Sequence, residues 1–148
     1  MRQYFRLPYA RIVLPVEAVT EERIQKMQDD VIFRFEMGTL TAKVRCEIDH
    51  HTARRMRSLI DERMFEVRPS MLILDFSEVR FMDSSGIGLI LGRCDSAADI
   101  GLTVRLVGLS NALMRLVRMS GIERVRNLSV SPKWAEERPR QRDAEWMQ

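Results

Sequence analysis

Hydrophobic and polar residues alternate along the chain in two periods, and the period of two marks the predicted strands. An apolar run at residues 31–35 leads into a turn at 37–38, and residues 40–46 then alternate between apolar and polar. This pattern predicts a β-hairpin with one buried face. Residues 71–76 are almost continuously apolar, which predicts a strand covered on both faces. Two further strands are predicted at residues 103–107 and 125–130.

A period of three to four residues predicts three helices between these strands. The first has Asp49 or Thr52 as its N-cap, and the second begins at residues 83–86. The third is capped at residues 110–111 and stopped by Gly121. The second helix carries three glycines, which are expected to leave room for close backbone approach: Gly86, Gly88 and Gly92. Strands and helices that alternate in this way predict an α/β fold.

The two ends of the chain lack such regular patterns. Residues 1–30 hold a short extended piece at 12–16 and a marginal amphipathic helix at 20–30, so we interpret them as an N-terminal extension. Residues 131–148 form a charged tail that two prolines interrupt. The predicted organisation is therefore an extension (1–30), one domain (31–130) and a tail (131–148).

Composition narrows the class of protein. The chain has 148 residues, 45% of them hydrophobic and 30% charged, which is typical of one globular domain. Its apolar runs are far shorter than the ~20 residues of a membrane span, and the N-terminus lacks a secretory signal, so we expect a cytoplasmic protein without membrane contact. The net charge is +3, and the basic residues are scattered along the chain, which disfavours direct nucleic-acid binding. Cys46 and Cys94 sit in apolar patterns and are expected to be buried, reduced thiols.

The segment most informative about a functional site is Phe81-Met-Asp-Ser-Ser-Gly-Ile-Gly88, which joins a predicted strand to a helix. Free N–H groups at a helix N-terminus can bind a hydroxyl, a carboxylate or a phosphate. An ordinary N-cap explains the same residue types, and on residue types alone it is the favoured interpretation, because Ser and Asp are the commonest caps. A serine hydrolase would need a GxSxG elbow with a histidine base, and Ser84 and Ser85 are not framed in that way.

Metal and nucleotide chemistry find no support in the sequence. His50 and His51 are the only histidines, and adjacent helical residues point about 100° apart, so they make a poor metal site. No GxxxxGK[ST] motif occurs. We therefore expect no metal, no cofactor and no nucleotide hydrolysis.

Three segments together resemble the bacterial anti-sigma factor antagonists of the STAS domain family, in particular the sporulation type. They are residues 47–53 (Glu-Ile-Asp-His-His-Thr-Ala), 81–93 and 110–121, and the resemblance spans about 31–130. It implies the STAS fold, a mixed sheet of about five strands flanked by helices, without catalytic activity.

In that family the unphosphorylated antagonist binds an anti-sigma factor that is also a serine kinase, and this releases the sigma factor. The resemblance implies that phosphorylation of Ser84 switches binding off and that a PP2C-type phosphatase restores it. We expect a monomer or weak dimer. The alternative is a STAS scaffold subunit of a larger signalling assembly, which the additional ends of the chain favour. The residues expected to form the partner surface are Asp49, His50, Asp83, Ser84, Ser85, Gly86 and Ile87.

Overall fold

A computed structural model describes residues 2–7, 10–15 and 30–133 of the chain. Within these residues, one five-stranded sheet has the order β3-β4-β5-β6-β7. A separate two-stranded antiparallel sheet pairs β1 (Arg2–Leu7) with β2 (Ala10–Pro15). The strands of the larger sheet are β3 (Val31–Glu36), β4 (Thr39–Val44), β5 (Met71–Asp75), β6 (Thr103–Leu109) and β7 (Leu128–Pro132).

The hairpin that the sequence predicts is formed by β3 and β4, which pair antiparallel. Its turn consists of Met37 and Gly38, which both have positive φ values (49° and 77°). Such a turn matches the right-handed twist of the flanking strands, and glycine adopts a positive φ without steric cost. The pairs β4–β5, β5–β6 and β6–β7 are parallel, so the sheet is mixed, as expected for the STAS fold.

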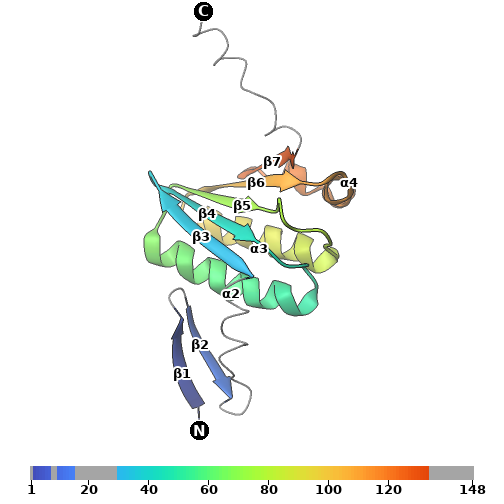
Figure 1. Ribbon diagram of the computed structural model, residues 1–148. Coiled ribbons are helices and arrows are strands. Elements are labelled where there is room, and N and C mark those ends of the chain that lie inside the picture. The colour runs from blue at the N-terminus through green and yellow to red at the C-terminus, as the bar shows by residue number, and fades with distance from the viewer. Residues whose placement is uncertain (1, 8–9, 16–29, 134–148) are drawn as a thin grey trace, which may run out of the picture.

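The helices α2 (His50–Val67) and α3 (Ser84–Asp99) lie side by side along one face of this sheet (Figure 1). Helix α4 (Asn111–Ser120) and the 3-10 helix η2 (Ile122–Arg124) follow β6. The apolar faces of α2 and α3 pack against alternate residues of the strands in one continuous core. Burial of this apolar surface is the main contribution to the stability of the fold. No helix among the described residues is long and apolar enough to span a bilayer.

Helices α2 and α3 are also joined by a buried ion pair. Arg93 of α3 is 3% exposed, and its Nε atom lies 2.7 Å from Oδ1 of Asp61 in α2. The Nη1 atom of Arg93 has no hydrogen-bond partner within the described part of the chain. Burial lowers the pKa of Arg93 and raises the pKa of Asp61. The orientation of the two helices therefore depends on a charge pair as well as on apolar contacts.

Several details differ from the sequence-based expectations. Strand β5 is covered on one face only: Leu72 and Leu74 are fully buried, whereas Met71 and Ile73 on the other face are half-buried. Strand β7 begins at Leu128 instead of residue 125, because the 3-10 helix and a turn to Leu128 take up the intervening residues.

In the N-terminal extension, the structure adds strand β1, which the sequence pattern did not indicate, and extends the predicted piece at 12–16 into β2. Residues 20–29 of the predicted helix lie outside the described residues.

Candidate functional site

Two loops far apart in the sequence are joined at the ends of β4 and β5. Ile48 and Met82 form an isolated parallel bridge. The Ile48 N–H donates to the Phe81 carbonyl at 3.0 Å, and the Asp83 N–H donates to the Ile48 carbonyl at 3.1 Å. Since the residue after each bridge position is the N-cap of a helix, this pairing places the N-termini of α2 and α3 next to each other.

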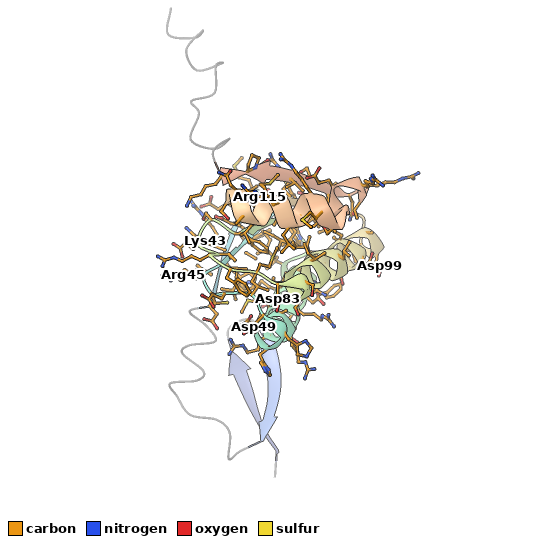
Figure 2. The ribbon with its side chains drawn as sticks, turned by 90° about the vertical axis from the view of Figure 1, so that its right-hand side faces the viewer. Lys43, Arg45, Asp49, Asp83, Asp99 and Arg115 are labelled. Atoms are coloured by element: carbon orange, nitrogen blue, oxygen red, sulfur yellow. The ribbon has the colours of Figure 1, made fainter. Side chains whose placement is uncertain are left out.

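An aspartate caps each of these two helices. Asp49 Oδ1 accepts hydrogen bonds from the His51 and Thr52 N–H groups, each at 2.9 Å, and Thr52 Oγ1 accepts one from the Asp49 N–H at 2.8 Å. Asp83 Oδ1 accepts a hydrogen bond from the Ser85 N–H at 2.7 Å. Asp49 and Asp83 lie near each other on the side of the molecule that faces the viewer in Figure 2. Of the two candidates for the cap of α2, Asp49 is the cap and Thr52 completes the capping box as the third helical residue. The two capping aspartates bring two carboxylates to one surface.

The capping hydrogen bonds keep Asp49 ionised. The hydrogen bond from the Thr52 backbone N–H is the largest influence on this carboxyl, and it lowers the pKa of Asp49. The Thr52 hydroxyl and the His51 N–H act in the same direction. At neutral pH this surface therefore carries a fixed negative charge at Asp49.

Ser84 is the first residue of α3, and it is exposed. Its hydroxyl makes no hydrogen bond within the described part of the chain, whereas Asp83 supplies the cap of the helix. The cap and the accessible hydroxyl are therefore two different residues. The neighbouring Ser85 is only half-exposed, and it contributes its backbone N–H to the cap. Ser84 is thus the hydroxyl on this surface that a second macromolecule can reach most directly.

Gly86 is buried beneath this surface and lets α3 pack closely on the bridge. A Cβ atom at this position would overlap the Met82 side chain and would lie 3.3 Å from Cγ2 of Ile48. At Gly88 and Gly92 a Cβ atom would meet nothing within 4 Å, so the expectation of close approach is correct for Gly86 and wrong for the other two. Gly86 contributes backbone space to the site and no exposed side chain.

The remaining predicted residues lie at the same end of the molecule. His50 is exposed at the start of α2, and Ile87 is half-buried in α3. Sequence reasoning missed Phe81, whose side chain is 52% exposed although its carbonyl joins the two loops. No pattern distinguishes Phe81 from the buried Met82 beside it, because both are apolar residues in the same loop. An exposed aromatic ring on this loop, three residues before Ser84, adds an apolar contact point for a partner.

A polar cleft of about 720 Å³ opens beside the site. Its walls include Cys46 and Glu47, which precede the bridge, and Val79 and Arg80, which precede Phe81. Arg45 at its rim donates a hydrogen bond to Glu78 at 2.9 Å. The cleft and the Ser84 surface share the same two loops, so a macromolecule seated on one also approaches the other.

The described residues contain no cluster of three or more His, Cys, Asp or Glu side chains suited to a metal ion. The rings of His50 and His51 are 5.9 Å apart in an edge-to-face arrangement, and neither forms a hydrogen bond with Ser84 among these residues.

The two cysteines are free thiols, but only Cys94 is fully buried, and Cys46 is half-buried, which corrects that part of the prediction. Burial raises the pKa of each thiol to about 11, so both are protonated at neutral pH. Neither thiol is therefore suited to act as a nucleophile near neutral pH.

Comparison with known proteins places this arrangement in a family. The anti-sigma F factor antagonist of Paenibacillus polymyxa is 32% identical over 88 residues, which cover 60% of this chain and 75% of that protein. The anti-sigma-B factor antagonist of Listeria monocytogenes is 31% identical over 77 residues, which cover 51% of this chain and 66% of that protein.

Solved structures share the fold. The anti-sigma factor antagonist SpoIIAA in its unphosphorylated form has a TM-score of 0.59 at 21% identity, covering 79% of this chain and 95% of that chain. An anti-sigma factor antagonist from Mycobacterium paratuberculosis has a TM-score of 0.55 at 20% identity, covering 79% and 91%. The STAS domain family matches residues 24–135, which include the whole five-stranded sheet and the two helices capped by aspartate, and the chain therefore belongs to the STAS domain family.

Proposed function

We propose that this protein is an anti-sigma factor antagonist: its unphosphorylated form binds an anti-sigma factor that is also a serine kinase, and this binding releases the sigma factor. The observation that carries the proposal is the exposed, unbonded Ser84 hydroxyl between the Asp83 cap and the rest of the α3 N-terminus. The names of the relatives from Paenibacillus polymyxa and Listeria monocytogenes support the same class of function. The protein is then a regulatory binding module, and the kinase supplies the chemistry.

The proposed partner surface consists of the residues around the joined helix N-termini. Its exposed members are Asp49, His50, Phe81 and Ser84. Charged and aromatic side chains on a rigid platform suit a specific protein interface. Gly86 and Met82 hold the platform from below, so they affect binding through the position of the two loops.

Phosphorylation of Ser84 would switch this surface off by electrostatics. A phosphate group adds about −1.5 to −2 charges at neutral pH. In the free protein this charge is stabilised by the helix N-terminus and by water. In a complex, the phosphate, Asp83 and Asp49 would all be desolvated together, and that costs more free energy than in the free protein. A difference of about 3 kcal/mol lowers the affinity about a hundredfold. A PP2C-type phosphatase would reverse the switch.

The proposal is tested with the purified anti-sigma factor kinase encoded in the same organism. We expect Ser84→Ala to bind it as tightly as the unphosphorylated wild type and to accept no phosphate, and Ser84→Asp to bind at least about tenfold more weakly. Ser85→Ala is the matched control, since it removes the neighbouring hydroxyl and should still be phosphorylated. Equal affinity of Ser84→Ala and Ser84→Asp would contradict the electrostatic switch, and phosphate that persists in Ser84→Ala would contradict the assignment of the site.

A second candidate is a scaffold subunit of a larger signalling assembly. The observation that favours it is the separate β1–β2 sheet, which is not part of the five-stranded sheet. Light scattering coupled to size-exclusion chromatography distinguishes the two functions. A monomer or dimer supports the antagonist, and a particle of many subunits supports the scaffold.

A further inference from the structure

Strand β3 ends the five-stranded sheet, and its outer edge has no partner among the strands that the structure describes (Figure 1). Glu36 pairs with Thr39 across the two-residue turn, a position at which the two residues exchange hydrogen bonds. The Asp30 carbonyl also points to the inner side, where it accepts from the Arg45 N–H at 2.8 Å. The backbone N–H and C=O groups of successive residues in a strand point to opposite sides. Since those of Asp30 and Glu36 point toward β4, those of Phe35 point outward, away from β4.

Exposed apolar side chains gather at the same end of β3. Phe35 is 46% exposed although it lies opposite the fully buried Leu40, so its ring is on the helix-covered face but at the open edge. Met37 in the turn is fully exposed. Phe65, near the end of α2, is 48% exposed, and this end of α2 lies beside the turn because the Ser70 N–H donates to the Gly38 carbonyl at 2.7 Å. Edge strands with exposed apolar residues favour pairing with another strand.

The opposite face of β3 carries one positive and one negative side chain. Arg34 Nη2 and Glu36 Oε1 are 2.8 Å apart, and both side chains are mainly exposed (72% and 62%). The two residues flank Phe35. A second β3 strand running antiparallel and centred on Phe35 would therefore bring Arg34 opposite Glu36 of the other copy, twice.

We propose that two copies of this chain associate through β3, as antiparallel strands related by a two-fold axis at Phe35. The two Phe35 residues then exchange backbone hydrogen bonds, which are the groups that the strand direction leaves facing outward. Their rings meet on the helix-covered face, with Phe65 and Met37 of both copies alongside. On the other face the four charged side chains alternate in sign, which fixes the register of the pair.

This association leaves the proposed partner surface accessible. The turn at Met37 and Gly38 lies at one end of β4, and the loop to Asp49 leaves the opposite end of that strand. Each copy therefore presents its own Ser84 away from the shared edge. The inference stands independently of the proposed function, because nothing in it depends on phosphorylation or on an anti-sigma factor.

Charge reversal tests the register on the full-length chain. Arg34→Glu alone gives four acidic residues at the interface, and Glu36→Arg alone gives four basic ones, so each variant should associate at least about tenfold more weakly than the wild type. An equimolar mixture of the two variants restores opposite charges at every position and should form a heterodimer. Arg105→Glu is the matched control, because Arg105 is an exposed arginine on strand β6, inside the sheet.

Sedimentation velocity over a range of concentrations measures the association, and isotope labelling of one variant identifies the heterodimer by native mass spectrometry. We expect dimers of the wild type, of Arg105→Glu and of the mixture, and monomers of each single variant at the same concentration. A wild type that stays monomeric at every concentration would overturn the proposal. Protection of the Phe35 amide from hydrogen exchange in that monomer would show that another segment of the same chain covers the edge. Dimers that tolerate both single reversals would overturn it by placing the interface elsewhere.

Discussion

Replacing Gly86 by alanine tests how the candidate site is held together. Gly86 lies in the first turn of α3, and a Cβ atom there would overlap the Cγ and Sδ atoms of Met82. Met82 is 5% exposed, so its side chain cannot turn into solvent without leaving the core. Its backbone also forms the bridge to Ile48. The added methyl group therefore pushes directly on the contact that joins the two loops.

The expected change in the free energy of unfolding is the difference between two effects. Alanine in place of glycine favours a helix by up to about 1 kcal/mol. Insertion of a methyl group into a packed core costs about 1–3 kcal/mol. For Gly86→Ala the second effect is larger, and we expect a net loss of about 1 kcal/mol. For Gly88→Ala there is no atom within 4 Å to oppose the gain, so we expect the free energy of unfolding to rise by about 0.5–1 kcal/mol.

The assay is urea unfolding followed by far-ultraviolet circular dichroism, with Gly88→Ala as the control, because the same substitution is made two residues further along the same helix. A double variant with Met82→Ala removes the obstructing atoms. We expect its loss to be smaller than the sum of the two single losses by more than about 0.5 kcal/mol. The reasoning is refuted if Gly86→Ala is as stable as Gly88→Ala, or if the double variant shows simple additivity.

Three further predictions follow from other parts of the structure. Asp61→Asn leaves Arg93 buried without a counter-charge and should cost about 3 kcal/mol, whereas Arg93→Met combined with Asp61→Leu should cost much less, as chemical unfolding of the three variants would show. Burial raises the pKa of Cys94 to about 11 from an ordinary value near 9, so the unfolded chain releases this proton first as the pH rises. The free energy of unfolding should therefore fall between pH 9 and 11 by up to about 3 kcal/mol. Urea unfolding at several pH values should show that Cys94→Ala reduces this fall. Phe81→Ala should change the unfolding free energy by less than about 0.5 kcal/mol and weaken binding of the anti-sigma factor kinase about tenfold, measured by calorimetry; unchanged affinity would remove Phe81 from the proposed surface.

The sequence by itself determined the elements of the domain and the caps that begin its helices. Apolar residues at a period of two or of three to four residues specify which face of an element is buried. Asp49, Asp83 and Ser110 are among the residues that the sequence offered as caps, because an oxygen one residue before a helix can accept its free N–H groups. For α2 the sequence left Asp49 and Thr52 as alternatives. Gly121 likewise ends α4 with a φ of 77°, as its position after the apolar stripe predicted.

Only the tertiary structure decided which of these local features meet. The bridge between Ile48 and Met82 places Asp49 and Asp83 at one surface, and no local pattern specifies a contact between residues so far apart in the chain. The same holds for the exposure of Phe81, for the one open face of β5 and for the difference between Gly86 and Gly88. Periodicity reports the faces of an element, whereas exposure and close contact depend on what the rest of the chain packs against it.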